Sequence, residues 1–279
     1  MEADTVPNLE DYVPPEFAPN TGAPEWLNAV DAGLLVLLLG LAAWAVTRRR
    51  SLWWLWSAQA VALLWFGFVR AGCLCPVGSV GNVSVALLHP DTVLGVMPIF
   101  YFVLPLAACL LRGRVFCGGV CPLGTVQDLL GFRARRTKSL VSARVERWLG
   151  LGAWIFLGFA IFAAWQWREL PICQYDPFVP LFHMAASWPA WILSGVVLSA
   201  CVFVSRPYCR WLCPYGALLC LFSRAAWRRR TIAPSCVKCR KCEKSCPMNC
   251  IEKGVIRESS CILCGRCAKV CRKDAVRDR

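Results

Sequence analysis

Five long hydrophobic stretches dominate the pattern of apolar and polar positions along the chain. A helix needs roughly 20 apolar residues to cross the hydrocarbon core of a bilayer. Tryptophans stand at several ends of these stretches, as is typical of helices that meet a membrane surface. The pattern therefore predicts a membrane protein of the all-α class with about five transmembrane helices, at residues 26–46, 52–69, 93–111, 148–167 and 188–204.

The first stretch has the least regular pattern, because Asn28 and Asp31 interrupt its start. The composition supports a membrane protein all the same, since 57% of the 279 residues are hydrophobic and the mean hydropathy is +0.50. A water-soluble core does not need apolar runs of this length. The same composition excludes an intrinsically disordered chain and a disulfide-stapled miniprotein.

The charged residues predict how the helices are oriented in the membrane. Residues 1–47 contain acidic side chains but no Lys or Arg, whereas the loops after the first and third stretches and the C-terminal tail are strongly basic. The loops after the second and fourth stretches carry only Arg70 and Arg168. Because cytoplasmic loops are enriched in Lys and Arg, we expect a multi-pass protein of the bacterial inner membrane with a periplasmic N-terminus and a cytoplasmic C-terminus.

These patterns divide the chain into three parts. Residues 1–25 are expected to be an external acidic segment, residues 26–227 a transmembrane helical domain, and residues 228–279 a separate C-terminal domain. The net charge of +14 does not indicate a nucleic acid partner, because most basic residues stand beside apolar stretches. We expect contact with membrane lipid instead.

The C-terminal domain carries eight cysteines in two runs with the same spacing, C-x-x-C-x-x-C-x-x-x-C. We call residues 236–246 the first cysteine motif and residues 261–271 the second. In two-cluster ferredoxins the fourth cysteine of each run binds the cluster of the other run. The spacing therefore predicts two [4Fe-4S] clusters, cluster one on Cys236, Cys239, Cys242 and Cys271, and cluster two on Cys261, Cys264, Cys267 and Cys246.

Two other uses of these cysteines are less consistent with the spacing. Zinc sites favour paired C-x-x-C knuckles without the third and fourth members, and disulfides are rare in the cytoplasm. Cys250 falls outside the spacing and is interpreted as a bystander. We therefore expect residues 228–279 to form a small cytoplasmic α+β domain of the two-[4Fe-4S] ferredoxin type.

A repeat in the membrane part gives a second signal. Residues 114–132, the first copy, and residues 206–224, the second copy, share Arg-x-aromatic-Cys-x-x-x-Cys-Pro-x-Gly. Each copy follows an odd-numbered apolar stretch and so falls on the cytoplasmic side, with its Cys-Pro step at a helix start. We predict that the repeat forms one cofactor or electron-transfer site, the four-cysteine site, rather than free thiols or a redox dithiol pair, from Cys117, Cys121, Cys209 and Cys213.

A degenerate third copy at residues 70–80 contains Cys73 and Cys75 and falls on the periplasmic side, as does Cys173. These three cysteines predict either a further cluster or metal site, with His89, His183 or Asp176 as a fourth ligand, or a structural disulfide favoured by an oxidising compartment. The pattern of residues leaves both alternatives open.

From about residue 50 onward the chain resembles the NapH-type quinol dehydrogenase subunits, the C-terminal half of NosR and the MauN-type ferredoxin proteins. The resemblance rests on several apolar stretches, the two C-x-x-x-C-P motifs and the two C-terminal cysteine motifs. It implies a membrane polyferredoxin that moves electrons between the quinone pool and a periplasmic redox system, such as a nitrate or nitrous oxide reductase. The chain departs from the NapH pattern in its five apparent spans, where that family typically has four.

We therefore expect a membrane-bound iron–sulfur protein of a respiratory electron-transport chain, linking the quinone pool or a cytoplasmic reductant with a periplasmic redox partner. Whether it is itself a quinol dehydrogenase subunit stays open. A quinone site would need a proton acceptor near the headgroup, for which the periplasmic loops offer His89, Asp91, Glu169, Asp176 and His183. The alternative function, which CcoG-like copper-handling proteins suggest, is an assembly factor that reduces a metal or a disulfide during maturation of a periplasmic oxidoreductase.

Overall fold

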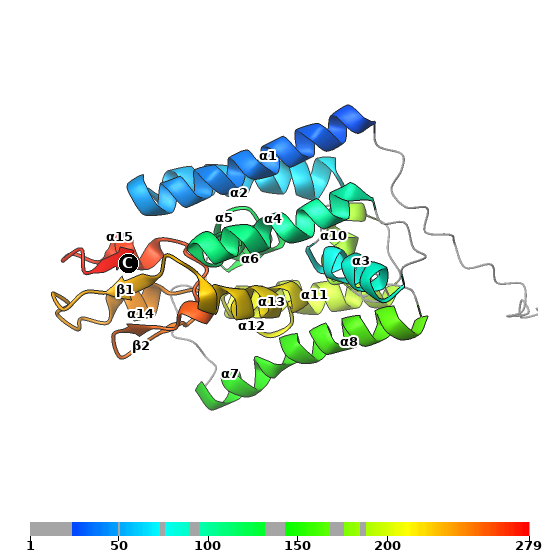
Figure 1. Cartoon of the computed structure of the whole chain (residues 1–279). Helices are drawn as coiled ribbons and strands as arrows, with labels where there is room; N and C mark the ends of the chain where they lie inside the picture. Colours follow the sequence, from blue (N-terminus) through cyan, green and yellow to red (C-terminus); the bar gives the residue numbers. More distant parts are fainter. Residues whose placement is uncertain are drawn as a thin grey trace, which may run out of the picture.

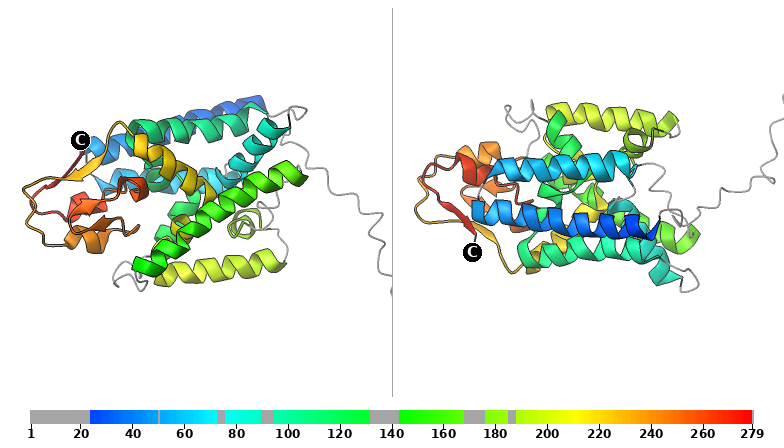
Figure 2. Two further views of the ribbon diagram at one scale, coloured as in Figure 1. Left: turned by 60° about the horizontal axis from the view of Figure 1, so that its bottom comes forward. Right: turned by 90° about the horizontal axis from the view of Figure 1, so that it is seen from above.

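The protein is a bundle of helices with a small α+β domain at one end (Figure 1). The computed structural model describes residues 24–49, 51–72, 76–89, 95–131, 143–167, 176–184 and 188–278. The external acidic segment at residues 1–25 therefore lies almost wholly outside the described residues. Figure 2 shows from two further sides that the α+β domain caps a single end of the bundle.

Each predicted hydrophobic stretch forms a helix. The first two run from Glu25 to Trp44 (α1) and from Leu52 to Ala62 (α2), and both continue as π-helical turns, Ala45–Arg49 (η2) and Leu63–Val69 (η3). The others are α4 (Val96–Arg112), α8 (Leu151–Trp167) and α11 (Trp188–Phe203). Shorter helices accompany them: α3 (Pro76–Leu88), α7 (Ala143–Leu149) and α10 (Val179–His183).

Two of these helices, Glu25–Thr47 and Leu52–Val69, are long and apolar enough by themselves to cross a membrane. The apolar parts of α4, α8 and α11 have 10–17 residues, and α3 contains a further apolar segment, Val77–Leu88, that the hydrophobic pattern did not single out. The number of spans therefore stays a prediction, whereas the mostly helical architecture is confirmed.

The repeat in the membrane part does not form surface loops. Its copies fold into two pairs of short helices, α5 (Val115–Gly119) with α6 (Pro122–Leu130) and α12 (Pro207–Trp211) with α13 (Pro214–Phe222). These helices lie among the long ones (Figure 1): α5 contacts α1 and α4, α6 contacts η3 and α11, and α13 contacts α4 and α8. Each C-P step begins a helix with proline at its first position, as the sequence predicts.

The C-terminal domain has the expected α+β composition. Strand β1 (Arg230–Ile232) pairs antiparallel with β4 (Val276–Asp278), and β2 (Ile251–Glu252) pairs with β3 (Val255–Ile256). Between them lie α14 (Lys241–Ser245), the turn η5 (Glu258–Ser260) and α15 (Arg266–Val270). A second turn, η4 (Ser223–Ala225), contacts η5 and so connects the domain to the bundle.

One hydrophobic core runs through both parts of the protein. The buried cluster includes Leu35 and Leu55 of the long helices, Phe116 of the first copy, and Ile262 and Cys267 of the second cysteine motif. Because apolar burial is shared across the boundary, the α+β domain is packed onto the bundle rather than tethered to it. The cysteines of the C-terminal domain and those of the four-cysteine site, which we call the two sets of cysteines, are therefore held in a fixed relation to each other.

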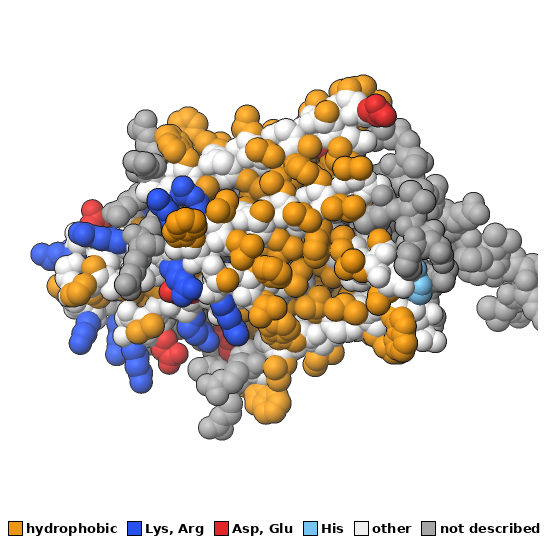
Figure 3. Space-filling model, viewed as in Figure 1, with side chains coloured by type: hydrophobic (Ala, Val, Ile, Leu, Met, Phe, Trp, Pro, Cys, Tyr) orange, Lys and Arg blue, Asp and Glu red, His pale blue; other side chains and the backbone are white. Residues whose placement is uncertain are grey.

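The outer surface of the bundle is strongly apolar. Large hydrophobic side chains are exposed on the long helices, including Trp53 (74%), Leu64 (62%), Ile155 (69%) and Val196 (61%). Figure 3 shows hydrophobic side chains over the middle of one face and Lys and Arg gathered at the end that carries the α+β domain. An apolar surface of this extent marks contact with lipid or with another protein.

The acidic residue that interrupts the first stretch is neutralised inside the bundle. Asp31 is 1% exposed, accepts a hydrogen bond from Trp65 Nε1 at 2.7 Å, and pairs with Arg70 Nε at 2.8 Å. A buried carboxylate needs such partners to remain charged. Asp31 of α1 and Arg70, which follows η3, thus compensate each other, which the linear pattern did not reveal.

Candidate functional site

The cysteines predicted to hold cluster two line one cavity. Its walls include Cys261, Cys264 and Cys267 of the second motif and Cys246 of the first, with Arg230 beside them. The fourth cysteine is thus brought across from the other motif, in the arrangement that the ferredoxin spacing predicts. Their role as ligands stays a prediction.

Cys250, which the spacing leaves over, lies in the same cavity. Its Sγ is 3.3 Å from Cys246 Sγ, and its backbone N–H donates to that sulfur at 3.4 Å. The hydrogen bond from Cys250 holds the pKa of the Cys246 thiol below its usual value. The interpretation of Cys250 as a bystander stays a prediction, but a four-residue turn after Cys246 brings its side chain to the cavity.

The cysteines predicted to hold cluster one also come from converging segments. Cys236 follows β1 and Cys271 precedes β4, so the antiparallel pairing of these strands brings their segments together. Cys242 lies in α14, which packs against α15, directly before Cys271. The N–H of Lys238 donates to Cys236 Sγ at 3.4 Å, and that of Ala275 donates to Cys271 Sγ at 3.3 Å.

The two cysteine motifs share a backbone conformation as well as a spacing. At two matched positions inside the motifs and at one position three residues after each, the backbone enters the left-handed region, with φ values between 48° and 72°: Lys238 and Leu263, Arg240 and Gly265, Asn249 and Asp274. Alternation of right- and left-handed residues turns successive N–H groups into one concavity, the arrangement that surrounds many iron–sulfur clusters. The backbone of both motifs therefore fits an anionic cluster.

The two copies of the membrane repeat face each other. A Cβ at Gly124 of the first copy would lie 3.3 Å from Arg206 Nη1, and a Cβ at Gly216 of the second would lie 3.1 Å from Arg114 Nη2. The first arginine of each copy thus packs on the glycine of the other, which is a pseudo-twofold arrangement. Gln127 adds a direct link, since its Nε2 donates to Cys209 Sγ at 3.1 Å.

This packing brings the four-cysteine site together in a buried environment. Cys117 and Cys121 are each 8% exposed, and Cys209 and Cys213 are partly buried. Burial raises the pKa of the Cys209 thiol to about 11, and burial with the neighbouring thiols raises the pKa values of Cys121 and Cys213. Four such thiols would ionise together only around a positive centre, as thiolate ligands of iron do.

The arginines beside the four-cysteine site fit an anionic group. Arg114 is 4% exposed and lies within electrostatic range of Cys117, Cys209 and Cys213, and its Nε is buried without a hydrogen-bond partner among the described residues. A buried donor without an acceptor costs about 1–3 kcal/mol. A sulfur-rich cluster on these cysteines would supply acceptors and negative charge at this position.

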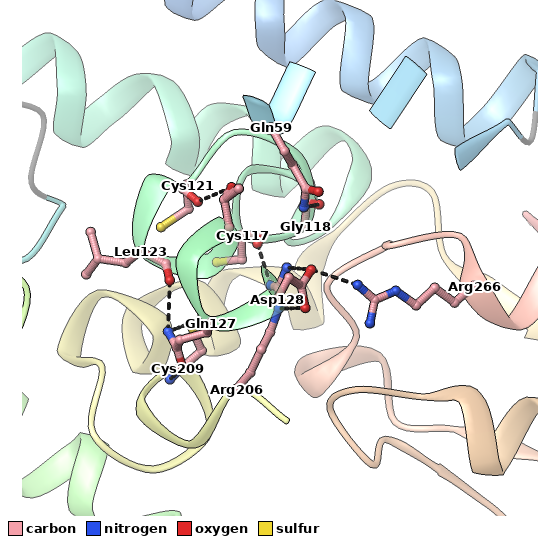
Figure 4. A network of polar contacts seen from close by, with 11 residues as sticks. Gln59, Cys117, Gly118, Cys121, Leu123, Gln127, Asp128, Arg206, Cys209 and Arg266 are labelled. Atoms are coloured by element: carbon pink, nitrogen blue, oxygen red, sulfur yellow. Dashed lines mark hydrogen bonds and ion pairs between the residues drawn. The ribbon is translucent and has the colours of Figure 1, made fainter. Parts of the chain in front are cut away.

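A buried charge network joins the two sets of cysteines (Figure 4). Arg206, which is fully buried, donates to Asp128 Oδ1 from Nε at 3.0 Å, to Asp128 Oδ2 from Nη2 at 2.6 Å, and to the Cys117 carbonyl from Nη1 at 2.6 Å. Arg266, between Cys264 and Cys267 of the second motif, donates to Asp128 Oδ2 at 2.8 Å. Asp128 therefore binds one arginine from each side of the domain boundary.

Gly118 provides a second close approach between the two sets. A Cβ at this position would stand 2.0 Å from the Ile262 carbonyl oxygen and 3.4 Å from the Cys264 nitrogen, while the Gly118 carbonyl accepts from Gln59 Nε2 at 2.7 Å. The first copy has Gly118 and Gly119 where the second has Arg210 and Trp211. The second cysteine motif leaves no room for a side chain at Gly118, and a Cβ at Gly119 would stand 2.5 Å from Ala42 Cβ of α1.

The second copy contacts the C-terminal domain through the side chain of Glu146 instead. Arg210 pairs with Glu146 of α7, and Asn249, which follows the first cysteine motif, donates from Nδ2 to Glu146 Oε2 at 2.8 Å. Glu146 therefore connects α12 to the α+β domain. Each copy of the repeat has its own contact with that domain.

We expect Gly118→Ala to destabilise the folded protein by about 1–3 kcal/mol, the usual cost of overpacking. The new methyl group can be accommodated only if the backbone at residues 262–264 moves. Thermal unfolding of the purified protein checks this, with Gly195→Ala as the matched control because a Cβ at Gly195 meets nothing within 4 Å. Equal unfolding temperatures for the two variants would contradict the close approach.

The candidates that the charge pattern predicts on the periplasmic side are only partly described. Cys73, Cys75, Cys173, Asp91 and Glu169 lie outside the described residues, so neither a metal site nor a disulfide can be drawn there. The His89 ring Nε2 is 3.2 Å from the Ala164 carbonyl, and Asp176 accepts the Phe178 N–H at 2.9 Å. His183 ends α10.

Within the described ranges, no three His, Cys, Asp or Glu side chains are close enough to bind one metal ion. A cubane needs a wider arrangement, because each thiolate binds a different iron atom. The sequence analysis missed Arg114, Gln127, Asp128, Arg206 and Arg266 as parts of the site. For two of them a signal was present, since an arginine begins each copy of the repeat.

Comparison with known families supports these assignments at the level of domains. Two families, both described as 4Fe-4S binding domains, match the chain, one at residues 94–139 and 184–233 and the other at residues 255–277. The first match contains both copies of the membrane repeat, and the second contains the whole second cysteine motif. No solved structure matches the chain.

Several known proteins are similar to more than half of the chain. An uncharacterized protein of Methanocaldococcus jannaschii is 29% identical over 200 residues, which cover 68% of this chain and 80% of that protein. Protein NirI of Paracoccus denitrificans is 29% identical over 245 residues, 81% of this chain and 36% of NirI. Ferredoxin-type protein NapH of Haemophilus influenzae is 29% identical over 175 residues, 59% of this chain and 57% of NapH.

Proteins named MauN, from Methylobacillus flagellatus, and NosR, from Pseudomonas aeruginosa, are also similar. The resemblance to NapH-, NosR- and MauN-type proteins is thereby confirmed. The chain spans only about a third of NirI and a little over half of NapH. What those larger proteins do as a whole does not pass to this chain without further argument.

Proposed function

We propose that this chain, an iron–sulfur electron-transfer protein similar to NapH, NosR and MauN, links the quinone pool or a cytoplasmic reductant with a periplasmic redox system across the bacterial inner membrane. The observation that carries the proposal is the contact between the two sets of cysteines. Asp128 pairs with an arginine from each set, and Gly118 lies against the second cysteine motif. Such packing gives two redox sites in series a fixed separation.

In this proposal the residues have two roles: some bind the clusters, and others position and surround the ligands. Cys236, Cys239, Cys242 and Cys271 hold cluster one, Cys246, Cys261, Cys264 and Cys267 hold cluster two, and the four-cysteine site holds a further cluster. The clusters supply one-electron transfer, with potentials set by burial and by hydrogen bonds to sulfur. The protein orients the thiols, excludes water from the four-cysteine site, and places Arg114, Arg206 and Arg266 beside them.

The exposed apolar surface and the basic end of the molecule support a position in a membrane, with the C-terminal domain in the cytoplasm. A basic pocket at the junction supports the same orientation. It is lined by Arg112, Arg228 and Arg230 together with apolar side chains of η2, α5 and the second cysteine motif, and none of the described residues that line it is acidic. Such a pocket suits the phosphate of an anionic lipid headgroup.

We expect phosphatidylglycerol to raise the unfolding temperature of the detergent-purified protein more than phosphatidylcholine does. The difference should shrink in the double variant Arg112→Gln/Arg228→Gln, because each basic residue near an anionic surface contributes about 1 kcal/mol. Arg272→Gln, an exposed change away from the pocket, is the matched control. An undiminished difference in the double variant would show that the pocket does not bind the headgroup.

Quinol oxidation and the delivery of electrons to a periplasmic acceptor can be tested together in proteoliposomes. The vesicles contain a reduced quinone in the membrane and ferricyanide trapped inside. If the protein transfers electrons across the membrane, ferricyanide should be reduced continuously, and Cys209→Ala should abolish this reduction. Cys220→Ala, which changes a thiol outside the four-cysteine site on α13, is the matched control. The same assay with a soluble low-potential reductant outside the vesicles tests the cytoplasmic entry route.

The second candidate function is the assembly factor, which the external cysteines Cys73, Cys75 and Cys173 favour. A protein that reduces a metal or a disulfide during biogenesis acts once for each client molecule. It would deliver a stoichiometric burst in the proteoliposome assay and then stop. Sustained turnover therefore rejects the assembly factor, and a burst without turnover rejects the electron-transfer link.

A further inference from the structure

Arg266 occupies the point at which the two sets of cysteines meet. It begins α15, between Cys264 and Cys267 of the second cysteine motif, and is 9% exposed. Its Nη2 donates to Asp128 Oδ2 at 2.8 Å, and Asp128 lies on α6, the helix that begins immediately after Cys121. A single guanidinium therefore belongs by sequence to cluster two and by contact to the four-cysteine site.

One end of this guanidinium is unsatisfied. Arg266 Nη1 is buried and has no hydrogen-bond partner among the described residues. Leaving a buried donor unpaired is unfavourable, and more so for a charged group. The cavity of cluster two adjoins Arg266 along the chain, since Cys264 and Cys267 flank Arg266 in sequence and line that cavity.

The charges around Arg266 agree with a position beside cluster two. Arg266 stands two residues after Cys264 and one before Cys267, and its charge is within electrostatic range of Cys264. The charge of Arg266 thus acts on the sulfur of a predicted ligand. On its other side, Asp128 is shared with Arg206, so two buried cations meet one carboxylate and the network keeps an excess positive charge.

We propose that Arg266 sets the reduction potential of the cluster held by Cys246, Cys261, Cys264 and Cys267, with Asp128 as the residue that fixes its position. In this role Nη2 holds Asp128 across the domain boundary while Nη1 donates to sulfur on the cluster side. A positive charge and a hydrogen bond to sulfur both stabilise the reduced, more negative cluster. The inference rests on the proposed function, because it presupposes that these cysteines bind a cluster.

The competing explanation is that Arg266 and Asp128 form only an interdomain salt bridge. Removing one partner from a buried pair destabilises a protein whatever its function. Stability alone therefore does not distinguish the two roles. A readout is needed that a purely structural contact leaves unchanged, and the midpoint potential of cluster two is such a readout.

The test is an EPR-monitored redox titration of wild type, Arg266→Lys and Arg266→Gln, with iron and sulfide counted for each protein. Arg266→Gln should disfavour reduction of cluster two about tenfold, which corresponds to about 59 mV for one electron. Arg266→Lys keeps the charge and can still pair with Asp128, but it lacks the second arm of the guanidinium. Its potential should therefore fall in the same direction, by a smaller amount, while the thermal stability stays close to that of the wild type.

Lys269→Gln is the matched control, because it removes a positive charge from an exposed position of the same helix. Its potential should equal that of the wild type. A wild-type potential in Arg266→Lys would overturn the proposal and leave the salt bridge as the only role, even if Arg266→Gln failed to fold. Absence of iron from the wild-type protein would instead reject the proposed function itself.

Discussion

Replacing Cys246 with serine is expected to remove cluster two and to leave cluster one in place. Cys246 belongs to the first cysteine motif by sequence, but it lines the cavity formed by Cys261, Cys264 and Cys267. Loss of one thiolate from a cubane removes the ligand of one iron and destabilises the whole cluster. The iron content should therefore fall by up to about four atoms per chain. EPR of the reduced protein identifies which cluster is lost.

Cys250 makes a second variant necessary. Its Sγ is 3.3 Å from that of Cys246, close enough to replace the missing thiolate. The double variant Cys246→Ser/Cys250→Ser should therefore show the full loss, and Cys250→Ser alone, the matched control, should keep both clusters. Selective loss of cluster one in the double variant would show that the crossed assignment is wrong.

The second large effect concerns the four-cysteine site. Cys117→Ala, Cys209→Ala and the double variant should all abolish transmembrane electron transfer to a similar extent. Residues that act as a unit give non-additive losses, because the first change already removes the function. Ferricyanide reduction in proteoliposomes measures this, and the site should lose its iron while clusters one and two keep theirs.

Two results would contradict a shared site. If the losses of Cys117→Ala and Cys209→Ala multiplied in the double variant, the two copies would act independently. If Cys220→Ala reduced transfer as strongly as Cys209→Ala, the effect would come from disturbed packing of α13, since Cys220 lies on that helix but outside the site.

Features that depend on local spacing could be predicted from the sequence. The helices of the bundle follow from apolar runs, and the cavity formed by Cys246 and the second cysteine motif follows from the ferredoxin spacing. The left-handed residues matched between the motifs, such as Lys238 and Leu263, are the structural counterpart of that repeat. In each case the spacing within one or two short segments contains the information.

Features that depend on tertiary contacts could not be predicted in this way. In the sequence, Asp128 has no feature that distinguishes it from other polar residues. Only the fold brings it into contact with Arg206 and Arg266. The two glycines of the first copy look like a departure from the repeat until the second cysteine motif is placed against Gly118. Asp31 weakened the first span as a prediction, although Arg70 and Trp65 stabilise it there.

The central claim is that the chain holds iron–sulfur clusters both in its C-terminal domain and in the four-cysteine site. The most direct measurement is the count of iron and acid-labile sulfide per chain in protein purified without oxygen. The account predicts about eight of each from two cubanes in the C-terminal domain, with an additional amount that disappears in Cys117→Ala/Cys209→Ala. Zinc in place of iron, or an iron count that the double variant leaves unchanged, would contradict it.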